Sequence, residues 1–423
     1  MNLAIMFLAL FILLVLYVPI AFAVAFASLI FIGLEGMPLF MVAQRMYSGS
    51  DSFVLLALPL FVMTGLLMNV GGISDKLIAL ARAMVGHIRG GLGIVNVVVS
   101  MFFAGVSGSA VADTAAVGSV LIPAMEKQGY PKDYAAAVTA ASSTIGIIIP
   151  PSIPMVLYGV IAGTSVGTLF IAGIVPGLMV ALGQMLVAYW IAVKKGYPVA
   201  NKFSLHILFK SFLSAAPALA LPIIIIGGIS FGVFTPTEAG AVAVVYALIV
   251  GVAYRSLSLK NVYKALVDSA ILSAIVMIIV STSTLLGWVL SYNRIPHLIT
   301  EVFLNLPGST NFILTILAAL LIFLGTFLHG TPLQIIVVPM LLPLIQALGV
   351  NMIHFGMIVV LCVGIGQQTP PVGSALYVTA AISDLDILDI VKASWPFILI
   401  IILTLLLVIY FPILSTFLPS ILR

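Results

Sequence analysis

The sequence FAGVSGSAVADTAAVGSVLIPAM occupies residues 103–125 and places glycine and serine in the middle of an apolar segment. A second segment repeats these interruptions 220 residues later, so that Pro123 corresponds to Pro343. The same offset relates the double prolines Pro150-Pro151 and Pro370-Pro371. Apolar segments broken by glycine and proline at matching positions in two halves of a membrane chain are typical of the binding sites of secondary transporters.

The composition is that of a polytopic membrane protein. Hydrophobic residues make up 63% of the 423 residues and charged residues only 7%, far below the roughly 25% charged residues of soluble domains. The only cysteine lies in an apolar run, so an intrachain disulfide is excluded. We expect an all-α fold, with five membrane spans and one re-entrant hairpin in each half.

The expected hairpins lie near residues 93–127 and 310–347, between the third and fourth spans of each half. Each could instead be two spans. We favour hairpins because each arm is short for a crossing, and because a polar tip is tolerated only where protein or water covers it. The expected full spans are residues 2–18, 19–34, 52–70, 134–164, 166–193, 213–231, 236–254, 268–291, 353–383 and 395–417.

Threading the chain through these spans separates its cations. Thirteen lie on one face, against Arg45, Arg294 and Arg423 on the other. This bias predicts that the lysine-rich face is cytoplasmic and the N-terminus is outside. Five crossings per half invert the second half relative to the first, which favours alternating access around a midplane site. The thirteen are Lys76, Arg82, Arg89, Lys127, Lys132, Lys194, Lys195, Lys202, Lys210, Arg255, Lys260, Lys264 and Lys392.

The 103–125 stretch resembles the signature of the large membrane (M) subunit of tripartite ATP-independent periplasmic (TRAP) transporters. The resemblance continues through SSTIGIIIPPSIPMVLYG (142–159), AGIVPGL (172–178), FTPTEAGAVAVVYAL (234–248) and GQQTPPVG (366–373), and so covers nearly the whole chain. It implies a sodium-driven elevator-type carrier in the bacterial inner membrane. It also implies two partners, a small four-helix membrane subunit and a periplasmic substrate-binding protein that delivers an organic acid.

The resemblance also implies a division into moving and fixed parts. The transport domain would comprise residues 92–165 and 309–385, each a hairpin followed by a broken helix. Scaffold and arm helices would occupy residues 1–91 and 166–308, with a cytoplasmic connector at 194–212, and residues 386–423 would form the last span. Asp51 and Asp268 are expected to begin long helices, and Asp384, Asp386 and Asp389 to form a capped, solvated helix start.

Two sodium sites are expected, one where each hairpin tip meets a broken helix. Hydroxyls and carbonyls freed by glycine offer the oxygen ligands that hard cations prefer. An ionisable group such as Asp113 inside an apolar segment is costly unless it is paired or functional. The alternatives are close packing by glycine and serine and a carboxylate bound by backbone N–H groups; the second half has Leu333 where the first has Asp113. The expected ligands are Ser107, Gly108, Ser109, Asp113, Thr144, Gly146, Gly325, Thr326, Gly366 and Thr369.

The substrate is expected between the two tips, near helix N-termini that favour a carboxylate. Arg294 would attract the acid, although it suits equally an interfacial anchor or a contact for the delivery protein. The resemblance makes C4-dicarboxylates and sialic acids both plausible. The expected substrate-binding residues are Ser109, Ser143, Thr331, Gln367, Gln368 and Arg294.

Other functions remain as alternatives. A carboxylate carrier could be coupled to another ion. A channel is disfavoured because the hairpins open to opposite faces and no ring of acidic or carbonyl residues is repeated. The sequence has no catalytic cluster of the kind an intramembrane enzyme needs, and no GxxxxGK[ST] motif for ATP. We expect no organic cofactor.

Overall fold

The computed structural model describes residues 1–199 and 203–422, and these are folded almost entirely into helices. The elements are α1 (Asn2–Val15), α2 (Ile20–Leu34), α3 (Phe40–Ser50), the short η1 (Phe53–Leu56), α4 (Ala57–Val70), α5 (Ile73–Val85), α6 (Gly91–Ser107), α7 (Ala110–Lys127), α8 (Lys132–Ser143), α9 (Ile145–Ile148), α10 (Ile153–Ala162), α11 (Val166–Lys195), α12 (Leu205–Ser230), α13 (Pro236–Ala253), α14 (Leu259–Tyr292), α15 (Ile295–Leu304), α16 (Thr310–Phe327), α17 (Gly330–Ala347), α18 (Met352–Gly366), α19 (Ser374–Ser383), α20 (Ile387–Tyr410) and α21 (Ile413–Ile421).

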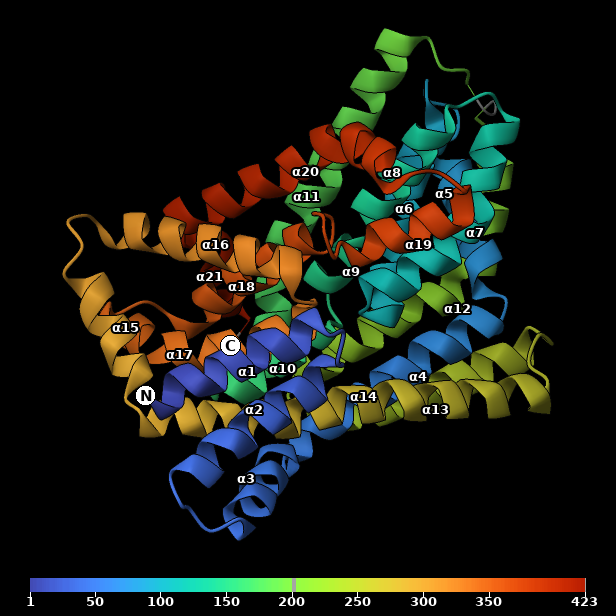
Figure 1. The fold of residues 1–423 in the computed structure, drawn as a ribbon. Coiled ribbons are helices and arrows are strands. Elements are labelled where there is room, and N and C mark those ends of the chain that lie inside the picture. The colour runs from blue at the N-terminus through green and yellow to red at the C-terminus, as the bar shows by residue number, and fades with distance from the viewer. Residues whose placement is uncertain (200–202, 423) are drawn as a thin grey trace.

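The helices gather into two groups (Figure 1). Helices α1–α4, α13 and α14 lie along one side, where α14 packs on α2, α3 and α4. Helices α6–α9 and α16–α20 lie on the other side, where α8 packs against α6, α7, α19 and α20. The two groups meet where α14 contacts α17 and α4 contacts α6.

Both segments expected to be hairpins are helix pairs with a short turn between them. Helix α7 (Ala110–Lys127) has its counterpart 220 residues later in α17 (Gly330–Ala347). Each pair is followed by a helix that stops at the double proline, and both proline pairs contain a cis peptide bond. The breaks follow from proline, which removes a backbone donor and clashes with the preceding turn.

The lengths of several helices differ from the expected spans. Eight helices of the described residues are long and apolar enough to cross a membrane, or nine if the bent pair at residues 132–162 counts as one span. Helices α1 and α2 have only 14 and 15 residues, fewer than the roughly 20 of a straight crossing. Conversely, α16 and α17, with 18 residues each, are both among the helices long and apolar enough to cross a membrane, so arm length does not favour a hairpin over two spans in the second half.

Three helices begin about two turns before the hydropathic spans expected for them, at Leu205, Leu259 and Ile387. The start at Ile387 is nevertheless the one that the acidic residues 384–389 predicted. The cause is capping, because Ser204, Ser258 and Asp386 each accept a hydrogen bond from a backbone N–H in the first turn. The first two turns of these helices carry the lysines Lys210, Lys260, Lys264 and Lys392. Helix α20 stops at Tyr410, just before Pro412, whereas its span was expected to end at residue 417.

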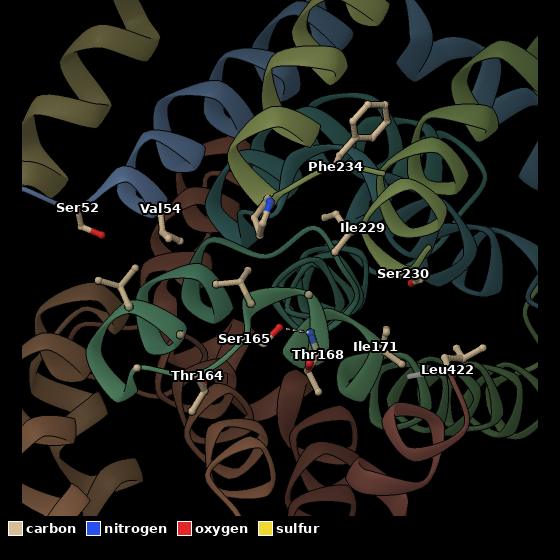
Figure 2. A pocket seen from close by; sticks show the side chains of 16 residues that line it. Ser52, Val54, Thr164, Ser165, Thr168, Ile171, Ile229, Ser230, Phe234 and Leu422 are labelled. Carbon is tan, nitrogen blue, oxygen red and sulfur yellow. Dashed lines mark hydrogen bonds between the residues drawn. The ribbon is translucent and has the colours of Figure 1, made fainter. Parts of the chain in front are cut away.

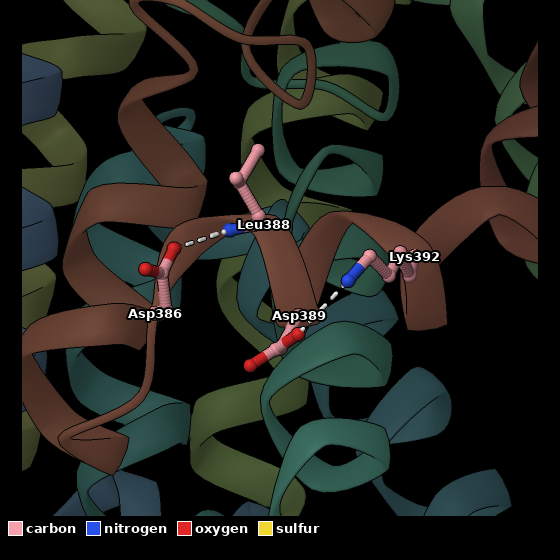
Figure 3. Close-up of polar contacts among 4 residues, drawn as sticks. All are labelled: Asp386, Leu388, Asp389 and Lys392. Atoms are coloured by element: carbon pink, nitrogen blue, oxygen red, sulfur yellow. Dashed lines mark hydrogen bonds and ion pairs between the residues drawn. The ribbon is translucent and has the colours of Figure 1, made fainter.

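The start of α20 has the capped, solvated form expected from its acidic residues (Figure 3). The Asp386 carboxylate accepts a hydrogen bond from Leu388 N at 2.9 Å, and exposed Asp389 pairs with Lys392 at 3.2 Å. The expectation for two other aspartates is wrong. Asp51 follows the end of α3 instead of beginning a helix, and Asp268 lies well inside α14, whose start is fixed by Ser258.

Loops that carry the lysine-rich charge lie together at one end of the bundle. Gly90 N donates to Pro198 O at 3.3 Å, and Ser256 Oγ donates to Gly71 O at 2.5 Å. Lys76 Nζ donates to Ser214 Oγ at 3.1 Å. The threading of the chain through the membrane stays a prediction, and Lys202 and Arg423 lie outside the described residues.

Candidate functional site

The tip of the first hairpin is docked on the first double-proline break. Helix α6 ends at Ser107, Gly108 adopts a left-handed φ of 63°, and Ser109 caps α7 by accepting a hydrogen bond from Ala112 N at 3.4 Å. A Cβ at Gly108 would lie 2.7 Å from Pro151 O, and Ile153 N donates to Gly108 O at 3.3 Å. Only glycine suits this turn, for both its backbone angle and its space.

Asp113 is the one fully buried acidic side chain of the described residues, in the first turn of α7. Its Oδ1 accepts a hydrogen bond from Ser107 Oγ, whereas Oδ2 has no partner among the described residues. A Cβ at Gly146 would overlap Oδ2, so the carboxylate lies directly against the backbone of α9. An unpaired buried carboxylate oxygen is costly unless a cation or a proton compensates its charge.

Ser143 and Thr144 lie behind this tip with their hydroxyls already engaged. Ser143 Oγ accepts from Thr114 Oγ1 at 2.6 Å and donates to Ala140 O at 2.8 Å. Thr144 Oγ1 donates to Ala141 O at 2.7 Å and accepts from Gln368 Nε2 at 2.9 Å. Their side chains therefore hold the broken helix in place, and Gln368 joins the two halves of the chain.

The second tip makes a comparable contact with the second break. A Cβ at Gly366 would lie 2.9 Å from Gly325 O, and Val372 N donates to Thr326 O at 2.9 Å. Thr326 Oγ1 donates to Phe323 O within α16 at 2.8 Å, and Thr369 Oγ1, in the turn after α18, donates to Ile365 O at 2.8 Å. The structure thus brings the four sodium-ligand candidates of the second half into one region, with both threonine hydroxyls donating to nearby backbone carbonyls.

Of the remaining candidates for substrate binding, three lie at the tips and one lies away from them. Ser109 and half-buried Thr331 lie at the starts of α7 and α17. Gln367 lies at the second tip, where a Cβ at Gly330 would be 3.2 Å from its Nε2, and its Oε1 has no partner among the described residues. Arg294 is exposed in a left-handed turn before α15 and takes part in none of these tip contacts.

Two buried glutamines belong to the site region but were missed from the sequence. Gln184 of α11 donates from Nε2 to Ala141 O at 3.1 Å, and Gln368 reaches the same carbonyl at 3.3 Å. Gln334 of α17 is 0% exposed, and neither its Oε1 nor its Nε2 has a partner among the described residues. Polar amides inside long apolar helices were the signal that could have identified both.

Two cavities lie away from the tips and share Ser52 and Val160 as lining residues. The first, of about 540 Å³, lies where the turn between α10 and α11 faces the turn between α12 and α13. Figure 2 shows Thr164, Ser165 and Thr168 on its α10–α11 side and Ile229, Ser230 and Phe234 on the other. The second, of about 520 Å³, lies between α3 and α14 on one side and α10 and α17 on the other.

Residues 7–414 match the family model of the tripartite ATP-independent periplasmic transporter, DctM component. The chain belongs to this family. Among relatives of this DctM-family chain, the sialic acid TRAP transporter large permease protein of Vibrio cholerae is 39% identical over 95% of each chain. The C4-dicarboxylate TRAP transporter large permease protein of Rhodobacter capsulatus is 37% identical over 96% of each.

The fold of the DctM-family chain is also found in a solved structure. The YdaH transporter of Alcanivorax borkumensis superposes with a TM-score of 0.58 at 15% identity, covering 90% of this chain and 86% of that one. At this identity the likeness concerns the fold alone. Together, the family and the apolar helices make the chain a multi-pass membrane protein of a transporter permease family.

Proposed function

We propose that the chain is a sodium-coupled importer of a small organic acid of the C4-dicarboxylate or sialic acid class. A periplasmic binding protein delivers the acid, and a small four-helix membrane subunit accompanies the chain in the bacterial inner membrane. The N-terminus is periplasmic and the lysine-rich end cytoplasmic. A carrier coupled to another ion is the alternative; channel and enzyme functions are disfavoured by the family match.

The observation that carries the proposal is Asp113 at the first tip. Its unpartnered Oδ2 faces the backbone of α9, and Ser107 Oγ lies at its other oxygen. Carboxylate, hydroxyl and carbonyl oxygens are the ligands of hard cations, and a bound cation would offset the cost of the buried charge. A sodium ion held here would also neutralise the tip before an anionic substrate arrives.

The region between the tips suits a carboxylate. The N-termini of α7 and α17 carry partial positive charge and exposed N–H groups. Ser109, Thr331 and Gln367 lie beside them. The names of the relatives include sialic acid and C4-dicarboxylate, and the hydroxyl-rich tips do not discriminate between one carboxylate and two.

The arrangement of helices supports an elevator mechanism. The tips and both broken helices, residues 92–165 and 309–385, pack against one another through α6 to α9 and α16 to α19. Helix α14, with α2, α3 and α4, forms the group against which they would slide. Moving the tips as one body would keep the site intact while its access changes from one side of the membrane to the other.

The test of the sodium site is stability in sodium against potassium. A ligand that binds only the folded chain at one hundred times its Kd stabilises it by about 2.7 kcal/mol. We expect sodium, but not potassium, to raise the melting temperature of the purified chain, and Asp113→Asn to abolish that increase. Equal melting temperatures in both salts over the whole concentration range would contradict the sodium site.

A further inference from the structure

The second cavity has one wall rich in polar side chains and one apolar wall. Its α3 and α14 wall is lined by polar side chains, among them Arg45, Ser283, Thr284 and Ser291, whereas apolar side chains of α10 and α17 line the opposite wall. At about 520 Å³ it has the size usual for small-molecule sites, roughly 300–1,000 Å³. No acidic residue lines it among the residues that the structure describes.

Arg45 is a half-buried cation without a protein counter-ion. Its Cζ lies 5.2 Å from the ring centroid of Trp288, which in turn lies 5.7 Å from the ring of Tyr292. Within the described part of the chain its side chain has no hydrogen bond or ion pair, and its Nε is buried. A guanidinium presents a rigid fork of donors that matches a carboxylate, and leaving the buried Nε donor unpaired is costly.

Two glycines form the cavity and position the arginine. A Cβ at Gly49 would overlap Thr284, so only glycine lets α3 approach α14 this closely. One turn away along each helix, Arg45 meets Trp288. Gly287 lines the cavity with no atom within 4 Å of its Cβ position, and so leaves open volume beside the indole.

We propose that this cavity is a second carboxylate-binding site, distinct from the tips, in which Arg45 binds the anion and the hydroxyls of α14 bind its polar groups. The apolar wall is formed by side chains of α10, which follows the first double-proline break, and of α17, which begins at the second tip. An acid bound here lies beside the elements that carry the tip site. The identity of the ligand as the transported acid rests on the proposed function.

The test uses Trp288 as the reporter in the full chain. Replacing Trp190 and Trp395 by phenylalanine leaves Trp288 as the only tryptophan of the three. In phosphatidylcholine nanodiscs and potassium buffer, we expect succinate or N-acetylneuraminate to change its fluorescence saturably. Arg45→Gln removes hydrogen bonds to a charged group, so it should weaken binding by at least about ten-fold. Absence of a saturable response to both acids would overturn the proposal.

Two further variants keep the result interpretable. A Cβ at Gly287 meets no atom within 4 Å, so Gly287→Leu should fill part of the cavity and abolish the response, with the melting temperature confirming a folded chain. Arg89→Gln removes an exposed cation that does not line the cavity and should leave the response unchanged. An unaltered response in both Arg45→Gln and Gly287→Leu would overturn the proposal.

The bound anion could come from water or from a lipid headgroup, and nanodisc composition separates the two. If phosphatidylglycerol alone alters Trp288 fluorescence and neither acid competes, the site belongs to lipid and the proposal fails. The acid response should persist in Asp113→Asn. In the chain with Asp113 intact, sodium-dependent uptake without a fluorescence response to the acids would overturn this inference alone. Sodium-independent uptake with the fluorescence response present would overturn only the proposed function.

Discussion

At the scale of single residues, the chemistry of the first tip depends on the close approach of Asp113 to Gly146. Any side chain at residue 146 would occupy the space of Asp113 Oδ2. We therefore expect Gly146→Ala to displace the carboxylate and to abolish the sodium-dependent increase in melting temperature. The measurement is thermal unfolding of the variant in sodium and in potassium.

Gly364→Ala is the matched control for this substitution. It also lies in a buried helix before a double proline, but its Cβ would come no closer than 3.6 Å to any neighbour, Ile147 Cδ1, which is ordinary van der Waals contact. It should retain the sodium response. A full response in Gly146→Ala would show that the pocket beside Asp113 Oδ2 holds no ion.

The sequence identified Asp113 because a carboxylate inside an apolar segment stands out without any structure. It did not identify Arg45 as more than a cation on one face, because its importance depends on Trp288, more than 200 residues away. Arg294 was the preferred arginine for the opposite reason, its nearness in sequence to the second hairpin. Contacts between distant segments decide such roles, and hydropathy does not encode them.

At the scale of elements, the two broken helices are joined by Gln368. Its Nε2 bonds Thr144 Oγ1 and Ala141 O while the side chain is 0% exposed. Gln368→Leu removes these bonds and leaves the Thr144 and Ala141 acceptors with fewer donors, which should lower the free energy of unfolding by about 1–3 kcal/mol. Thermal or denaturant unfolding of the purified chain measures this loss.

Gln334→Leu is the control, because Gln334 is as buried but makes no hydrogen bond within the described residues. Replacing an unpaired buried amide by an apolar group of similar size should be neutral or stabilising. Equal destabilisation by both substitutions would mean that burial, and not the link between the broken helices, determines the effect.

The elements themselves were largely predictable, and their ends were not. Proline and glycine at a constant offset located the hairpins and the breaks, since these residues act on the backbone directly. The starts of α12 and α14 depended on caps at Ser204 and Ser258 that were not identified from the sequence, whereas the acidic residues around Asp386 did predict the start of α20. Hydropathy marks the edge of the hydrocarbon, but a capped helix continues beyond it.

At the scale of the whole molecule, the two groups of helices give the tips and the broken helices a common support. Helix α14 spans 34 residues, roughly 50 Å at 1.5 Å per residue, and contacts elements of both groups. The second cavity lies at this boundary, between α14 and α17. Sliding of one group past the other would therefore change the cavity and the access to the tips together.

The most direct test of the account is uptake of labelled acid into proteoliposomes that hold the chain and its small membrane subunit, with the binding protein outside. The account predicts uptake that requires both an inward sodium gradient and the binding protein, and that is lost in Asp113→Asn. Equal uptake with potassium in place of sodium, or undiminished sodium-driven uptake by Asp113→Asn, would contradict it.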